Sequence, residues 1–174
     1  MSKERDLIKL TINNLDELDS FSSTLAKIFF SEEKCLIFLN GPLGAGKTTL
    51  SQKLGKHLGV KDIITSPTFN IFKRYSFKSG YLNHFDLYRI ESDVYDQGFE
   101  EYWYSNEITI IEWSSFLPEE FKNIYDLKID IEICDDYRVL KINGNQNLIN
   151  KIKEKCNEFI YWYNIKLSYF FSVW

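Results

Sequence analysis

The chain has 174 residues, of which 44% are hydrophobic, so it is long enough for one domain with a substantial core. Its formal net charge of −4 argues against a protein that binds nucleic acid alone, because such binding depends largely on neutralising phosphate charge. The three cysteines are far apart and odd in number, which argues against a zinc site or a disulfide framework. We expect a cytoplasmic protein, because reduced cysteines suit the cytosol and residues 1–6 lack the apolar core of a signal peptide.

The N-terminal residues predict a strand, a helix and a second strand. Residues 7–12 alternate well enough for a strand. Asn14 stands three residues before Glu17, which is the spacing of a helix capping box, and apolar residues then recur at helical intervals. Residues 35–39 are continuously apolar, as expected of a parallel strand that is buried on both faces.

A glycine-rich loop follows at residues 41–48 and matches the phosphate-binding pattern G-x-x-x-x-G-K-[ST]. The strand before it and the predicted helix over residues 49–58 give the pattern its proper context. In such a loop, backbone N–H groups converge on phosphate oxygens beside the positive end of the helix. We expect Lys47 to contact the terminal phosphates and the Thr48 hydroxyl to bind Mg²⁺. The predicted nucleotide-binding residues of the loop are Gly41, Leu43, Gly44, Ala45, Gly46, Lys47, Thr48 and Thr49.

The Ser66-Pro67-Thr68 segment breaks regular structure. Taken alone it is most simply a turn, although comparable hydroxyl-bearing loops act as switches near the nucleotide in P-loop enzymes. Residues 70–75 and 81–86 then predict a hairpin that runs antiparallel to the main sheet.

The hairpin ends in a polar cluster at residues 84–89. His84 and Asp86 are two apart, so on a strand they share one face. Asp86 would suit a role in holding a Mg²⁺-bound water or in orienting the attacking water, and Arg89 would suit a contact to phosphate. A structural cluster of ion pairs explains the same residues equally well.

An acidic stretch over residues 91–102 predicts a solvated face with short helical turns around Gly98. Four β-branched residues at 108–111 then lead to Glu112, as in the strand that carries the metal-site carboxylate of P-loop enzymes. Glu112 is therefore a candidate for the Mg²⁺ shell or for positioning water, against the alternative of an ordinary glutamate at a strand end. Trp113 is predicted either to stack near the nucleotide or to pack in the core.

The C-terminal part predicts a hairpin and a helix. Residues 127–133 and 137–142 alternate on either side of an Asp-Asp turn. Residues 146–174 carry apolar residues at every third or fourth position, which predicts an amphipathic helix that covers the sheet, docks a partner or lies on a membrane surface. From Phe159 onward the only charged residue is Lys166, and this stretch is shorter than the ~20 apolar residues that a transmembrane helix needs. We divide the chain into a P-loop domain, 1–145, and this tail, 146–174.

Five motifs together resemble the TsaE family, formerly called YjeE, which is the small bacterial ATPase of tRNA threonylcarbamoyladenosine biosynthesis. The resemblance runs from about residue 7 to residue 142, and its most specific element is the His-x-Asp-x-Tyr-Arg cluster. The motifs occupy residues 41–49, 66–69, 84–89, 98–102 and 111–113.

The resemblance implies an α/β fold with a central parallel sheet, extended by antiparallel strands and flanked by helices. It implies an ATPase that needs Mg²⁺ and supports the TsaB–TsaD complex, which transfers the threonylcarbamoyl group to adenosine 37 of tRNA; contact with tRNA would be indirect. Carried over, Thr48 and Glu112 would hold Mg²⁺, Asp86 would be catalytic or in the outer metal shell, and Trp113 would lie near the nucleotide. The switch-like residues would be Ser66, Thr68, His84 and Arg89.

Two alternatives stay open. A small-molecule kinase shares the loop, but such enzymes usually clamp phosphates with an arginine-rich lid, and only Arg138 follows Glu112. A nucleotide-sensing module would bind ATP without useful turnover. Weak turnover by the isolated chain fits both this module and a partner-stimulated ATPase, because the sequence offers no convincing internal arginine finger.

Overall fold

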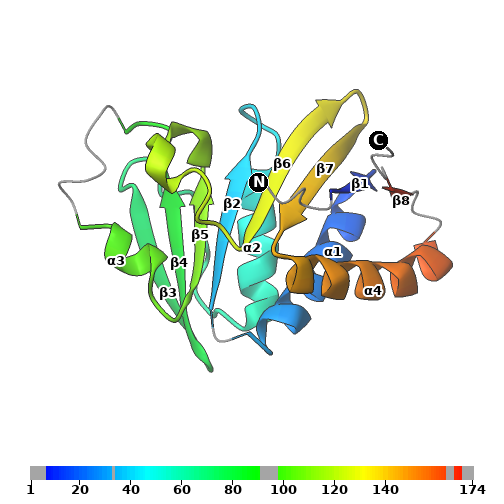
Figure 1. The fold of residues 1–174 in the computed structure, drawn as a ribbon, viewed down its shortest axis with the longest axis horizontal. Coiled ribbons are helices and arrows are strands. Elements are labelled where there is room, and N and C mark those ends of the chain that lie inside the picture. The colour runs from blue at the N-terminus through cyan, green and yellow to red at the C-terminus, as the bar shows by residue number, and fades with distance from the viewer. Residues whose placement is uncertain (1–6, 33, 91–97, 164–166, 170–174) are drawn as a thin grey trace.

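The computed structural model describes residues 7–32, 34–90, 98–163 and 167–169 (Figure 1). Most of the acidic stretch at 91–102 and the end of the tail lie outside these ranges. The strands are β1 (Ile8–Ile12), β2 (Cys35–Asn40), β3 (Phe72–Phe77), β4 (Gly80–Asp86), β5 (Ile108–Glu112), β6 (Leu127–Cys134), β7 (Tyr137–Gly144) and β8 (Leu167–Tyr169). The helices are α1 (Leu15–Phe29), α2 (Lys47–Leu58), α3 (Glu100–Trp103) and α4 (Gln146–Tyr163), with short 3₁₀ turns η2 (Ser114–Phe116) and η3 (Glu119–Phe121).

The strands form one mixed sheet in the order β3-β4-β5-β2-β6-β7-β1-β8. Its centre is parallel, because β4 pairs with β5, β5 with β2 and β2 with β6 in the same direction. The pairs β3–β4, β6–β7, β7–β1 and β1–β8 are antiparallel. This arrangement confirms the predicted α/β class, with a parallel centre extended by antiparallel strands.

The predicted direction of the first hairpin is wrong for one of its two strands. β3 runs against the main sheet, but β4 is parallel to β5, with Asp86 directly opposite Glu112. The two strands of a hairpin run in opposite directions, so one of them must follow the direction of its neighbour in the sheet. As a result, the acidic end of β4 reaches the same sheet edge as Glu112.

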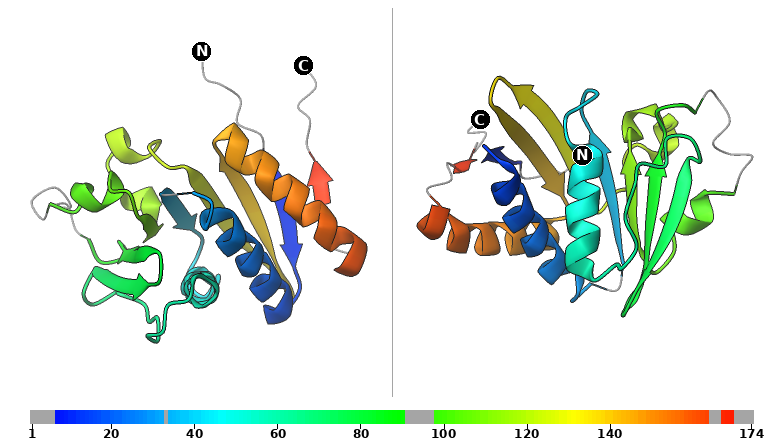
Figure 2. Two further views of the ribbon diagram at one scale, coloured as in Figure 1. Left: turned by 90° about the horizontal axis from the view of Figure 1, so that it is seen from below. Right: turned by 180° about the vertical axis from the view of Figure 1, so that it is seen from behind.

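Helices α1, α2 and α4 cover one face of the sheet (Figure 2). The other face carries an aromatic cluster beneath α3 and the two 3₁₀ turns. Side chains alternate between these two faces along each strand. Phe85 and Ile111 enter the aromatic cluster, whereas His84 and Glu112, which are their neighbours on β4 and β5, face α2.

The start of α1 and the end of α2 lie where the sequence predicts them. Asn14 caps α1, and its Oδ1 accepts hydrogen bonds from the backbone N–H groups of Asp16 and Glu17, both at 3.0 Å. Gly59 ends α2 in the left-handed conformation, with φ of 90°.

The tail is helical over only part of its length. In α4, Leu148, Ile149, Ile152 and Cys156 are buried in the core beneath the sheet, so this part covers the sheet as one of the alternatives predicted. A single helix through residue 174 is wrong, because Leu167–Tyr169 form β8 beside β1. None of the helices in the described ranges is both long and apolar enough to cross a membrane. The division at residue 145 stays a prediction.

Candidate functional site

The glycine-rich loop connects β2 to α2 at the carboxyl edge of the parallel strands (Figure 1). Its three glycines have positive φ angles, which are 146° at Gly41, 76° at Gly44 and 105° at Gly46. A Cβ atom at Gly41 would lie 2.6 Å from the carbonyl oxygen of Ile131. The loop therefore needs glycine both for its backbone conformation and for its close approach to β6.

Lys47 lies folded over this loop and is buried. Its Nζ donates hydrogen bonds to the carbonyl oxygens of Gly41 at 2.7 Å and Pro42 at 2.9 Å. Burial lowers the pKa of the Lys47 ammonium, while the nearby carboxylates of Glu112 and Asp86 act in the opposite direction. A phosphate oxygen can replace these carbonyl oxygens as the partner of Nζ.

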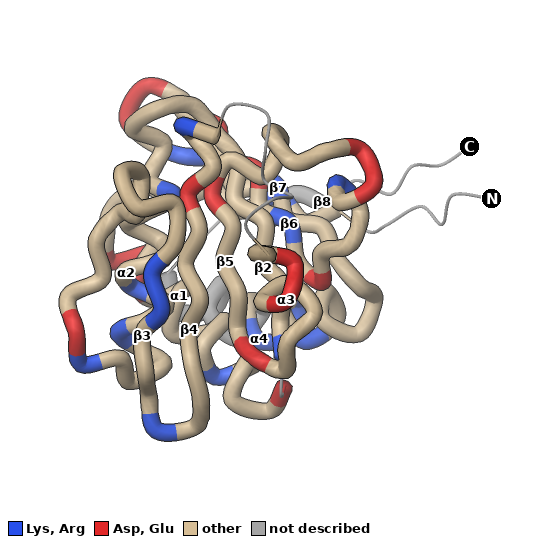
Figure 3. The backbone as a smooth tube through the Cα atoms, turned by 90° about the vertical axis from the view of Figure 1, so that its left-hand side faces the viewer, with Lys and Arg blue, Asp and Glu red and all other residues tan. Residues whose placement is uncertain are grey.

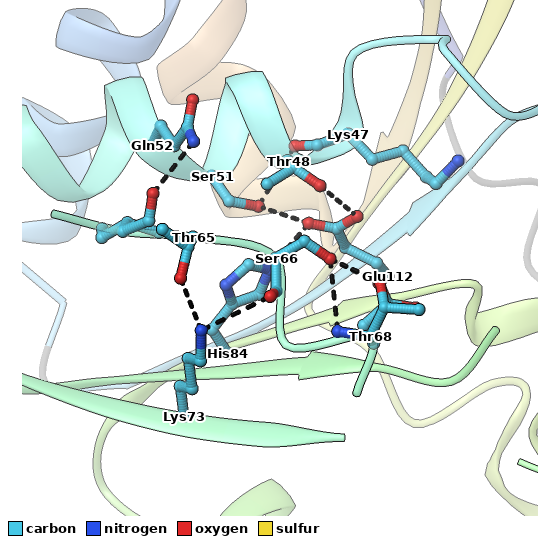
Figure 4. A network of polar contacts seen from close by, with 12 residues as sticks. Lys47, Thr48, Ser51, Gln52, Thr65, Ser66, Thr68, Lys73, His84 and Glu112 are labelled. Carbon is cyan, nitrogen blue, oxygen red and sulfur yellow. Dashed lines mark hydrogen bonds and ion pairs between the residues drawn. The ribbon is translucent and has the colours of Figure 1, made fainter. Parts of the chain in front are cut away.

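The carboxylate of Glu112 is the centre of a polar network at the end of β5 (Figure 4). Only 1% of Glu112 is exposed. Its Oε2 accepts a hydrogen bond from Thr48 Oγ1 at 3.0 Å, and its Oε1 accepts from Ser51 Oγ at 3.3 Å. His84 Nε2 lies 2.7 Å from the same Oε1. The donors come from α2 and from β4, so the network ties the helix after the phosphate loop to the sheet.

The donor set fits a magnesium ion of the P-loop type. Such an ion takes a threonine hydroxyl and phosphate oxygens as ligands, with a strand carboxylate beside them. Thr48 donates its hydrogen to Glu112, which leaves the lone pairs of the hydroxyl oxygen for a cation. The described part of the chain contains no group of three or more His, Cys, Asp or Glu side chains that could hold a metal ion.

Asp86 lies beside Glu112, because β4 and β5 end in neighbouring acidic positions (Figure 3). It is 2% exposed. Its Oδ2 accepts hydrogen bonds from Ser66 Oγ at 2.9 Å and from Thr68 Oγ1, and its Oδ1 accepts from the Tyr88 N–H at 3.0 Å. The Ser66–Thr68 turn is therefore closed over one of the two carboxylates of the site.

Side chains from α2 and β3 hold the start of this turn (Figure 4). Gln52 Nε2 donates to the carbonyl oxygen of Ile64 at 2.9 Å. Lys73 Nζ donates to Thr65 Oγ1 and, at 3.4 Å, to the carbonyl oxygen of Ser66. The segment is thus connected to α2 at one end and to Asp86 at the other.

Two predicted site residues lie in aromatic contacts. Trp113 has a left-handed φ of 59°, and its ring centroid is 3.8 Å from Lys47 Nζ and 5.7 Å from the Phe116 ring. The Arg89 guanidinium carbon lies 4.4 Å from the centroid of the Phe69 ring. The structure thus places Trp113 against the Lys47 ammonium and Arg89 against the exposed ring of Phe69. Their roles toward a nucleotide stay predictions.

A cavity of about 270 Å³ adjoins the loop on the side away from β4. Its lining combines the loop, the start of α1 and the β6–β7 turn, which lie far apart in the sequence. The start of α1 and the β6–β7 turn were not predicted to belong to the site, because neither carries a recognisable motif. The lining residues outside the loop include Asn13, Asn14, Leu15, Asp136, Tyr137 and Arg138, and those that were already predicted are Gly44, Ala45, Gly46 and Thr49.

A family model described as threonylcarbamoyl adenosine biosynthesis protein TsaE matches residues 12–140. The chain belongs to the TsaE family. This result confirms the resemblance carried by the five motifs, and it places both the loop and Glu112 within the matched region of this TsaE-family chain.

Individual proteins agree with the family match. The chain is 37% identical over 142 residues to the tRNA threonylcarbamoyladenosine biosynthesis protein TsaE of Rickettsia typhi. The aligned region covers 80% of this chain and 96% of that relative. The Haemophilus influenzae protein of the same name is 32% identical over 134 residues, or 74% of the chain and 81% of the relative. A crystal structure of Bacillus subtilis YdiB shares the fold, with a TM-score of 0.70 at 24% identity over 91% of this chain and 99% of that one.

Proposed function

We propose that this TsaE-family chain binds ATP with Mg²⁺ and hydrolyses it in the cytoplasm, as a component of tRNA threonylcarbamoyladenosine biosynthesis. The observation that carries the proposal is the hydrogen bond from Thr48 to Glu112 next to the folded Lys47. That arrangement joins a phosphate-binding loop to a carboxylate at the edge where α/β sheets bind ligands. The names of the relatives supply the tRNA modification.

Each polar group of the site has a role in this proposal. The backbone N–H groups of the loop bind phosphate oxygens, and Lys47 turns from the carbonyl oxygens of Gly41 and Pro42 to the terminal phosphates. Thr48 and Glu112 hold Mg²⁺, which neutralises charge on the phosphates when bound. Asp86 orients the attacking water once the hydroxyls of the Ser66–Thr68 turn release its Oδ2.

The cavity beside the loop takes the nucleoside part of ATP. It is continuous with Gly44, Gly46 and Thr49, so a base and ribose placed there leave the phosphates on the loop. Tyr137 offers a partly exposed ring for stacking, and Arg138 and the asparagines before α1 offer polar contacts.

Full activity in this proposal needs a partner. Charge develops on the transferred phosphoryl group in the transition state, and in other P-loop systems a cation supplied in trans accelerates the reaction by ~10³–10⁵. Homologues of TsaB and TsaD are the proposed partners, and tRNA is contacted only through their complex. A net charge of −4 is consistent with indirect contact to tRNA.

The test is ATP turnover by the purified chain, alone and with a TsaB–TsaD heterodimer from the same source. Lys47→Ala serves as the blank, because it removes the cation of the loop. A rise in turnover when the heterodimer is added supports both the activity and the partner. Bound ATP with no response to the heterodimer would contradict the proposal and favour a kinase, for which phosphoryl acceptors would then be screened.

A further inference from the structure

His84 is fully buried in β4, with 0% of its surface exposed, yet only one of its two ring nitrogens has a hydrogen-bond partner among the described residues. Nε2 lies 2.7 Å from Glu112 Oε1. Among the residues that the structure describes, none provides a hydrogen-bond partner for Nδ1. A buried polar atom without a partner is unfavourable, so an apolar side chain would suit this position better if packing were its only role.

The position of His84 in the sheet explains how it reaches Glu112. His84 is paired with Ile110 in the register of β4 and β5, and Asp86 is paired with Glu112. His84 and Glu112 are therefore diagonal neighbours on the same face, a separation that a long side chain can bridge. The donated hydrogen must be on Nε2, because a carboxylate oxygen accepts.

The two oxygens of Glu112 have different partners. Oε1 is held by His84 and Ser51, whereas Oε2 faces Thr48. The terminal torsion of a glutamate has broad energy wells, so a carboxylate without fixed partners rotates easily. The hydrogen bonds to Oε1 limit that rotation and keep Oε2 directed at the hydroxyl that is to bind the metal.

We propose that His84 is a positioning residue for the Mg²⁺ site: its Nε2 hydrogen bond fixes the Glu112 carboxylate so that Thr48 is correctly oriented for the ion. This inference rests on the proposed function, since it assumes that nucleotide binds with Mg²⁺. It assigns His84 no contact with nucleotide, metal or attacking water. Removing a residue that hydrogen-bonds to a metal ligand commonly lowers metal affinity about 10–100-fold.

The test compares three substitutions that separate the two ring nitrogens. In His84→Gln the side-chain amide nitrogen can reach the place of Nε2, whereas in His84→Asn it reaches only the place of Nδ1. His84→Leu keeps bulk without a donor. Binding of ADP is measured by calorimetry across a Mg²⁺ titration and again in EDTA, so the readout is affinity and not turnover. Thermal unfolding of each variant provides the check on folding.

We expect His84→Gln to keep the Mg²⁺ midpoint within about threefold of the wild type, and His84→Asn and His84→Leu to raise it about 10-fold or more. ADP affinity in EDTA should be the same in all four proteins. Unchanged midpoints in His84→Asn and His84→Leu would overturn the inference. An equal loss in all three variants would also overturn it, because that pattern indicates packing.

A measurement on the unmodified protein covers the case in which the variants do not fold. Nitrogen-15 spectra of the His84 ring should show the hydrogen on Nε2. A ring with hydrogen on Nδ1 and none on Nε2 would refute the positioning role. If the wild type binds ADP with no dependence on Mg²⁺, the proposed magnesium site itself is wrong, and the inference falls with it. That result differs from a Mg²⁺-dependent wild type whose variants behave normally.

Discussion

The close contact between α2 and the segment before the Ser66–Thr68 turn can be tested at Gly55. A Cβ atom built there would lie 2.0 Å from Ile64 Cδ1 and 3.0 Å from Leu82 Cδ2. Gly55→Ala therefore forces Ile64 to move. The carbonyl of Ile64 accepts the hydrogen bond from Gln52, so the displacement also affects the connection that holds the turn near the site.

The loss of unfolding free energy expected for Gly55→Ala is the difference between two opposing contributions. Forcing an extra methyl group into a packed site costs about 1–3 kcal/mol of unfolding free energy. Alanine in place of glycine in a helix returns about 1 kcal/mol, which leaves a net loss of about 0–2 kcal/mol. Ile64→Val removes the Cδ1 atom that meets the new methyl group, at its own cost of about 0.5–1.5 kcal/mol. The unfolding free energy that the double variant loses should therefore be smaller, by about 1–2 kcal/mol, than the sum of the losses in the two single variants.

The assay is urea unfolding followed by circular dichroism for the wild type, both single variants and the double variant. Lys56→Ala is the matched control, because Lys56 is an exposed neighbour on the same helix. Its effect should add to that of Ile64→Val without coupling. If the effects of Gly55→Ala and Ile64→Val add within about 0.5 kcal/mol, the close-contact explanation is refuted.

Three further predictions concern charge, packing and thiol reactivity. Burial lowers the pKa of Lys47 in the free protein, whereas bound phosphates favour its charged form, so nucleotide binding at alkaline pH should take up protons, increasingly as the pH rises toward that pKa. Calorimetry in two buffers of different ionisation enthalpy measures this proton uptake, and proton release would contradict the prediction. Ile152→Ala should lose about 2–5 kcal/mol of unfolding free energy in urea, whereas exposed Glu154→Ala should change it by less than about 0.5 kcal/mol. Burial raises the pKa of Cys156 to about 11, so at pH 8 a thiol reagent should modify half-buried Cys134 before Cys156, as peptide mass spectrometry would show.

The parts of the site that depend on local patterns could be predicted from the sequence. The glycine loop needs a fixed spacing between its glycines and Lys47, and Glu112 ends a run of β-branched residues, so both are visible in a short window. The roles assigned to Asp86 and Trp113 stay predictions. What the structure adds for them is location, with Asp86 beside Glu112 and Trp113 against Lys47.

The parts that sequence reasoning missed depend on which elements become neighbours. Alternation in β4 shows that His84 and Asp86 share a face, but it does not give the direction of β4 or the strand beside it. Asn13 and Arg138 both line the cavity, but they come together only when β1 pairs with β7. No local pattern in the sequence predicts that they are neighbours. The start of β8 was missed because the apolar spacing of the tail is compatible with a helix throughout.

The position of Trp113 gives this protein a built-in optical reporter. Indole emission responds to charge near the ring, and here the Lys47 ammonium lies 3.8 Å from the ring centroid. The proposed turn of Lys47 toward a phosphate would change the electric field at the indole. The chain has four tryptophans, so the difference between the emission spectra of the wild type and Trp113→Phe isolates this signal. The loop can thus be followed in solution by light, without attaching a dye.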